Sequence, residues 1–138
     1  MDLTLLDTSS AADEGAELQL VSPVDETVLR DDKTGEAVSI RLLGSDSKDF
    51  MKISQKIQDK RLQKRFSKGK VKMTAAELDA DAMELLIACT KSWKHIVIDK
   101  QPLPFNETNV RMLYDRFPWI REQVDTFIND RANFLGES

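Results

Sequence analysis

Residues 74–93 read TAAELDADAMELLIACTKSW and form the most apolar helical stretch of the chain. Thr74 and Glu77 make a capping box, in which the hydroxyl and the carboxylate each satisfy a backbone amide at a helix start. The apolar residues that follow lie along one helical face: Leu78, Ala82, Leu85, Leu86, Cys89 and Trp93. We therefore expect this helix to be the central element of the core.

A second helix is expected upstream of this one. The sequence GSDS at 44–47 stops an extended segment and supplies N-cap residues, so the helix should continue to about Phe66. Its apolar stripe is narrow and consists of Phe50, Ile53 and Ile57. Most other positions are Lys, Arg, Gln or Asp, which predicts a helix with largely solvated faces.

Two more helices are expected downstream of the central one. Asn106 is the predicted N-cap of the first, and Phe105 is placed to pack on Val110. Pro118 fits the first turn of the second, where its missing amide hydrogen costs nothing. Before them, His95–Ile98 has β-branched character and favours a short extended segment.

The N-terminal third favours strands. Apolar and polar residues alternate over 17–20 and again over 38–42, on either side of a turn at Gly35. This pattern predicts a β-hairpin or three-strand meander over 17–43, which must pack on helices or pair with another chain to be stable. Residues 1–16 are small, polar and acidic, and they predict a disordered tail.

Together these segments predict an α+β fold, in which an N-terminal β-hairpin or small meander precedes a bundle of about four α-helices. A chain of 138 residues has room for one domain, expected over 17–136 with its helices at 45–135. Gly136 is the expected end of the last helix. The longest wholly apolar run, Leu85–Cys89, is too short to span a membrane.

The residues that carry chemistry are few and scattered. A single cysteine, Cys89, excludes an intramolecular disulfide, and a single histidine, His95, removes Cys/His metal sites. There is no Gly-rich phosphate loop and no HExxH motif. Asp99 follows His95 by four residues, but across an extended stretch. We therefore expect a protein that is not an enzyme and that carries no cofactor or metal.

Charge is strongly polarised along the chain. Residues 1–36 carry ten acids against two bases, and residues 52–72 carry nine bases against Asp59 alone. The net charge of −4 argues against general nucleic-acid or anionic-membrane binding. The basic helix is therefore interpreted in three ways: a solvated face, a site for an acidic protein or a neighbouring copy, or a phosphate-binding face. Its candidate partner contacts are Lys56, Lys60, Arg61 and Lys64.

Large aromatic residues gather in the last third of the chain, and a domain of this size can bury only some of them fully. At helical spacing such residues usually fill a core, but those left near prolines commonly anchor protein interfaces. Trp119 neighbours Ile120, whose stripe faces the core, so we expect it to point partly elsewhere. The candidate partner-binding aromatics are Trp93, Phe105, Phe117, Trp119, Phe127 and Phe134.

The order and spacing of these segments resemble the tail assembly chaperones of siphophages. The resemblance rests on WKHI at 93–96, QPLPFNETN at 101–109, PWIREQV at 118–124 and RANF at 131–134. Members tend to show a Trp closing a helix, a Pro-Phe-Ser/Thr/Asn helix start and a last helix entered through Pro-Trp-Leu/Ile. The first half is similar through its strand pair, the GSDS element and a basic helix with Phe50 near its start.

The resemblance implies a function in protein binding. Such chaperones bind the long, apolar, largely helical tape measure protein in the host cytoplasm, keep it soluble and help recruit tail tube subunits. They are commonly made in two lengths by a translational frameshift and are usually absent from the finished virion. The acidic start and basic helix of neighbouring copies are complementary, which also predicts a homo-oligomer. The alternatives are a minor tail or connector protein retained in the virion, and a nucleic-acid-binding regulator that uses the basic helix at 52–72.

Overall fold

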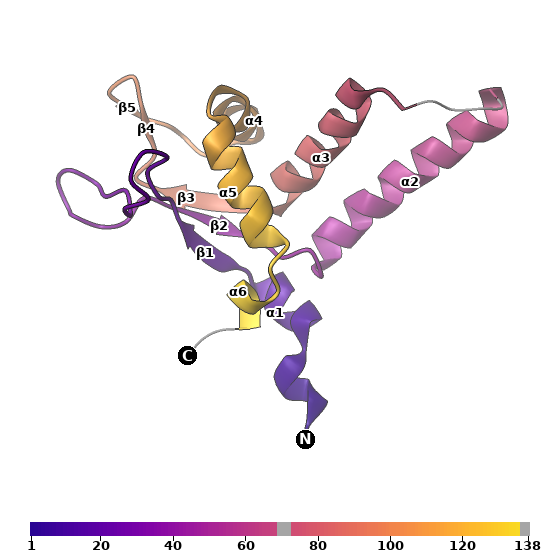
Figure 1. Cartoon of the computed structure of the whole chain (residues 1–138), viewed down its shortest axis with the longest axis horizontal. Coiled ribbons are helices and arrows are strands. Elements are labelled where there is room, and N and C mark those ends of the chain that lie inside the picture. Colours follow the sequence, from indigo (N-terminus) through magenta and orange to yellow (C-terminus); the bar gives the residue numbers. More distant parts are fainter. Residues whose placement is uncertain (69–72, 136–138) are drawn as a thin grey trace.

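The computed structural model describes residues 1–68 and 73–135 and has the α+β fold that the sequence predicts (Figure 1). Its elements are a 3-10 helix η1 (Leu3–Leu6), α1 (Thr8–Glu14), β1 (Ala16–Gln19), β2 (Ser39–Leu42), α2 (Lys48–Lys68), α3 (Ala75–Cys89), β3 (Thr90–Lys94), β4 (Val97–Ile98), β5 (Gln101–Pro102), α4 (Glu107–Arg116), α5 (Pro118–Ile128) and α6 (Ala132–Leu135). Within the described ranges, no helix combines the length and the hydropathy needed to cross a lipid bilayer.

Three strands form an antiparallel sheet in the order β1-β2-β3. The register places Leu18 beside Ile40 and Ile40 beside Trp93, so one face of the sheet is apolar. Glu17 lies beside Arg41 on the opposite face, where both side chains are exposed. This alternation, which the sequence predicts, is typical of an antiparallel sheet with one face in the core and one in water.

The hairpin predicted over 17–43 is present, with an elaborate connection between its strands. Residues 20–38, here called the double hairpin, make two tight turns closed by bridges between Val21 and Val28 and between Arg30 and Ala37. The amide of Leu20 donates to the carbonyl of Val38 at 2.9 Å, and the amide of Leu29 donates to the carbonyl of Leu20 at 2.9 Å. The amide of Val38 donates to Leu29 at 2.8 Å. These bonds hold three apolar residues side by side.

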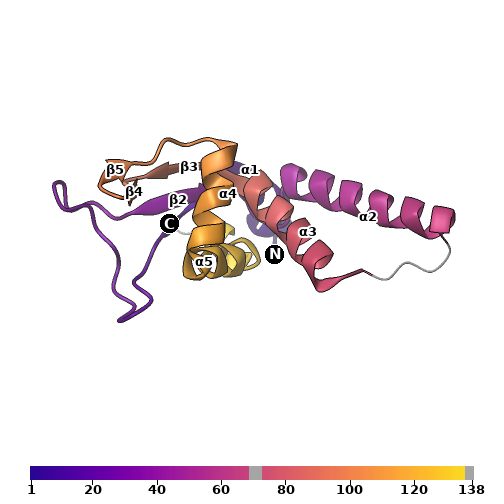
Figure 2. The ribbon, with the colours of Figure 1, turned by 90° about the horizontal axis from the view of Figure 1, so that it is seen from above.

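Helices α3, α4 and α5 pack with the apolar face of the sheet into one core, and Figure 2 shows α4 next to α5. Ile40, Leu113 and Val124 are completely buried. The hydroxyl of Thr90 donates to the carbonyl of Leu86 at 2.7 Å and lies 2.7 Å from the hydroxyl of Tyr114. Since the Thr90 proton is used on Leu86, Tyr114 donates to Thr90. Burial raises the pKa of Tyr114, so it stays protonated.

The predicted helix starts are confirmed. The hydroxyl of Thr74 accepts from the amide of Glu77 at 3.1 Å, and the side chain of Asn106 accepts from the amide of Asn109 at 2.8 Å. Pro118 occupies the first turn of α5. The two caps join residues three positions apart, and Pro118 acts through its own ring. Sequence alone identifies all three because the signals are local.

The prediction that the central helix includes Trp93 is wrong. The helix ends at Cys89, because the residues that follow pair with β2 as strand β3. His95 has a φ of 64° and turns the chain between β3 and β4, so His95–Ile98 is not one extended segment. The range 45–135 is therefore helical only outside the strands at 90–102. The expected helix end, Gly136, lies outside the described residues.

The prediction of a disordered tail over 1–16 also differs from the structure. Asp7 accepts from the amide of Ser10 at 3.0 Å and so caps α1. Ala12, on α1, is only 2% exposed, and its carbonyl accepts from the amide of Gly44 at 3.1 Å. A Cβ at Gly44 would lie 2.9 Å from the Cβ of Ala12, so this close approach needs a glycine. A single small buried residue gives no periodic apolar signal in the sequence.

Replacing Thr90 by Val should destabilise the protein more than replacing Tyr114 by Phe. Thr90→Val leaves the buried Tyr114 hydroxyl without its acceptor, which costs about 1–3 kcal/mol. Tyr114→Phe removes only a donor and leaves Thr90 bonded to Leu86, which costs about 1 kcal/mol. Urea unfolding of the two variants measures both losses. Equal losses, or a larger loss for Tyr114→Phe, would contradict this hydrogen-bond assignment.

Candidate functional site

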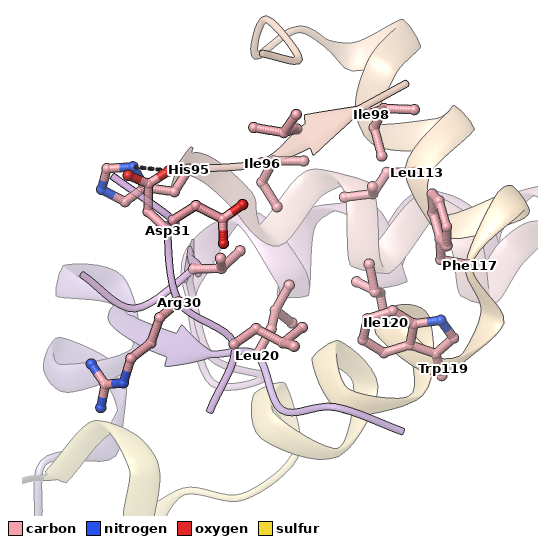
Figure 3. Close-up of a pocket in the computed structure, with 14 residues that line it drawn as sticks. Leu20, Arg30, Asp31, His95, Ile96, Ile98, Leu113, Phe117, Trp119 and Ile120 are labelled. Carbon is pink, nitrogen blue, oxygen red and sulfur yellow. Dashed lines mark ion pairs between the residues drawn. The ribbon is translucent and has the colours of Figure 1, made fainter. Parts of the chain in front are cut away.

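An apolar pocket of about 300 Å³, here called pocket A, lies between the double hairpin, the β4 segment and the start of α5 (Figure 3). Its apolar walls consist of Leu20, Leu29, Val38, Ile96, Val97, Ile98, Leu113, Phe117, Trp119 and Ile120. Its polar end consists of Arg30, Asp31, Asp32 and His95. The size and lining fall within the range of protein binding sites for apolar groups.

The junction between α4 and α5 supplies the aromatic wall of pocket A. Phe117 precedes the first turn of α5 and Trp119 lies in it, and their rings meet edge to face with centroids 6.2 Å apart. The guanidinium of Arg116 lies 5.3 Å from the centre of the Phe117 ring and pairs with Asp99 at 3.2 Å. Both aromatic side chains remain only partly buried, so they are held in place and still accessible.

A side-chain clamp fixes the double hairpin to α5. The amide group of Gln123 donates to the carbonyl of Val21 at 2.9 Å and accepts from its backbone amide at 3.0 Å. Gln123 thus satisfies the backbone of Val21 as a neighbouring strand would. The two walls of pocket A are therefore held by a specific contact as well as by packing.

A second hollow of about 490 Å³, here called pocket B, is lined by both residues of the clamp. Trp119 lines both pockets, so its indole forms part of the wall between them. Leu18, Pro23 and Phe127 give pocket B its apolar lining, and Glu26 and Glu122 are among its charged residues. Pockets A and B thus follow the same helix, α5.

At the polar end of pocket A, His95 lies close to two carboxylates of the double hairpin. The Nε2 atom of His95 lies 3.1 Å from Glu36, and its Nδ1 atom lies 3.7 Å from Asp31. Hydrogen bonds from the backbone and hydroxyl of Thr34 hold the pKa of Asp31 below its usual range.

Burial raises the pKa of Cys89 to about 11, which removes it as a nucleophile at neutral pH. Among the described residues, no three His, Cys, Asp or Glu side chains are grouped to hold a metal ion.

Comparison with protein-family models, curated proteins and solved structures gives no match. Inferences about function therefore depend on the two pockets and on the charges around them.

The six aromatic residues predicted as partner contacts form three separate edge-to-face pairs. Trp93 meets Phe105 at a centroid distance of 4.9 Å, and Phe127 meets Phe134 at 5.4 Å. The third pair is the wall of pocket A described above. Of the six, pocket A is lined by Phe117 and Trp119, and pocket B by Trp119 and Phe127. The structure therefore brings together three of the six at the two pockets.

The basic residues predicted as partner contacts lie mostly against α3. Lys60 and Arg61 pair with Asp81 at 3.4 and 2.9 Å, and Lys64 pairs with Glu77 at 3.2 Å. Burial on its own would raise the pKa of Asp81, but the two cations outweigh it and the pKa is lowered. Within residues 1–65 and 73–135, Lys56 has no ion pair. Three of the four cations therefore hold α2 against α3.

The double hairpin is a wall of the site that the sequence pattern does not predict. Leu29 and Val38 line pocket A because the backbone ladder with Leu20 aligns them. The alternation over 38–42 predicts only that Val38 lies on the apolar face of the sheet. Nothing in the sequence indicates that Gln123 bonds the backbone of Val21, because the two residues are 102 positions apart.

Replacing Asp81 by Asn should lower the Tm at neutral pH and make the Tm fall less steeply as the pH is lowered. The pKa of this carboxyl is depressed in the folded protein, so its stabilisation is present above the unfolded value of about 4. That stabilisation is lost as the pH falls through the folded pKa. Thermal unfolding between about pH 7 and about pH 3 measures the effect.

The matched control for this prediction is Asp59→Asn on α2, because Asp59 bonds Gln55 within the same helix. The control should follow the wild-type curve of Tm against pH. If Asp81→Asn and the wild type gave parallel curves, the α2–α3 ion pairs would contribute nothing to the acid dependence.

Proposed function

We propose that this protein is a tail assembly chaperone of a long-tailed bacteriophage, which binds and solubilises the tape measure protein during tail morphogenesis. The observation that carries the proposal is the pair of apolar pockets along α5, with Trp119 between them. Accessible apolar hollows beside a charged surface suit the apolar face of a helix from another protein.

The chaperone-like motifs support the proposal because they supply this site. The PWIREQV motif at 118–124 contains Trp119 of the shared wall and Gln123 of the clamp. The motif that begins at Gln101 supplies the N-cap of α4, the helix that leads into the aromatic wall. Parts of the segments that resemble the family thus line the pockets, together with the double hairpin.

The expected strength of binding also suits a chaperone that must release its client. Covering one partly exposed aromatic anchor contributes about 1–3 kcal/mol. Two or three such anchors give weak binding at a single site, since a micromolar dissociation constant requires about 8 kcal/mol. A long client with many apolar helical segments can be held by several copies and still be released one contact at a time.

Under this proposal the protein works in the host cytoplasm and is missing from the mature virion. Tail tube subunits, a frameshifted longer form and further copies of the chain are its additional proposed partners. The alternative, a minor tail or connector protein, predicts stoichiometric amounts in purified virions. A nucleic-acid-binding regulator is the weaker alternative, because Lys60, Arg61 and Lys64 are engaged by α3.

Trp119→Ala should sharply reduce the amount of co-expressed tape measure protein that stays soluble. Loss of the indole removes the wall shared by both pockets, and truncating such an anchor weakens binding by about tenfold or more. The measurement is the soluble fraction of the client after centrifugation, together with thermal melts that show the variant is folded.

Two further variants complete this test. Val97→Gln changes a residue at pocket A that is already 51% exposed, so it should weaken client binding without disturbing the core. Met51→Ala on α2, at a side chain 59% exposed and outside both pockets, should have no effect. The proposal fails if Trp119→Ala and Val97→Gln leave the soluble fraction unchanged, or if the client is equally insoluble without the protein.

A further inference from the structure

Carboxylates border both pockets. Asp31 and Asp32 lie at pocket A, and Glu26 and Glu122 lie at pocket B. The one Lys or Arg among the lining residues is Arg30, which donates to the carbonyl of Gly35 at 3.1 Å. Figure 3 shows its guanidinium directed away from Phe117 and Trp119. The apolar surface along α5 is therefore edged by negative charge.

Three of these carboxylates are available to a partner. Asp32, Glu26 and Glu122 are exposed, and none of the three has an ion pair with a residue that the structure describes. Asp31 differs, because its carboxylate accepts hydrogen bonds from Thr34 and faces His95. The free acids thus lie at both pockets, one at pocket A and two at pocket B.

Pockets A and B share one lining residue, Trp119, and both lie along α5. Trp119 lines both hollows and the Gln123–Val21 clamp lines pocket B, so a bound segment that fills both pockets must carry apolar side chains at two separate points on one face. An amphipathic helix presents such points one or two turns apart, at about 5.4 Å per turn. Its flanking positions then come close to the free acids.

We propose that pockets A and B together bind a basic amphipathic helix, with one apolar anchor in each pocket and Lys or Arg side chains opposite Asp32, Glu26 and Glu122. This inference depends on the proposed function and specifies the class of client segment that the site accepts. Charge complementarity selects the partner, because a helix with acidic flanks would place like charges against the same three carboxylates.

Two synthetic helices test the inference. Both are alanine-based peptides of about 20 residues with leucines at helical spacing, one with lysines and one with glutamates beside the leucine face. Binding is followed by peptide anisotropy and by the emission of Trp119 in a Trp93→Phe background. At low salt the lysine peptide should bind at least about tenfold more tightly than the glutamate peptide. This preference should become smaller in about 1 M salt.

Charge-neutralising variants locate the effect. Asp32→Asn combined with Glu122→Gln should remove most of the preference for the lysine peptide. The matched control, Asp59→Asn combined with Glu107→Gln, removes the same charge from exposed sites outside both pockets and should keep the preference.

The failures of the two proposals are distinguishable. Equal binding of both peptides with a shift in Trp119 emission, or tighter binding of the glutamate peptide, overturns the charge selection and leaves the pockets as a protein-binding site. Binding of neither peptide overturns the inference, while loss of client solubility in Trp119→Ala would still support the proposed function. Self-association that the same variants abolish would assign the pockets to a second copy of the chain and overturn the inference.

Discussion

The packing of the sheet's single apolar face against α5 is the contact on which the rest of the molecule depends. Ile40 of the sheet and Val124 of α5 are completely buried there. The double hairpin extends the apolar surface beyond the sheet, and its Leu29 and Val38 remain only partly buried. Pocket A is the part of this surface that the helices leave uncovered. The same apolar residues therefore stabilise the fold and form the proposed binding surface.

Polar contacts position the elements around this core. Gln123 holds the double hairpin to α5, and Asp81 receives two cations from α2. The ion pairs between α2 and α3 favour a structural role for Lys60, Arg61 and Lys64, because they give these cations partners within the chain. The negative charge near the pockets is different, since Asp32 and Glu122 are exposed and have no ion pair among the described residues.

The fold could be predicted largely from local chemistry. Thr74, Asn106 and Pro118 mark helix starts through contacts within a few residues, and alternation marked the sheet. The end of the central helix could not be predicted, because Trp93 pairs with Ile40 in a sheet that forms only in three dimensions. For the site, Trp119 was identified from its position beside Ile120. Its partners in the double hairpin were not, because their alignment depends on backbone bonds between residues far apart in the sequence.

Hydrogen exchange of this protein, alone and mixed with the tape measure protein that we propose as its client, tests whether the pockets along α5 bind that client. Backbone amides exchange more slowly where a partner covers and stabilises them. We expect slower exchange in the complex over residues 20–38 and 117–127, with exchange over α2 unchanged. Slowing confined to α2, or no slowing anywhere in a stable complex, would show that the pockets along α5 do not hold the client.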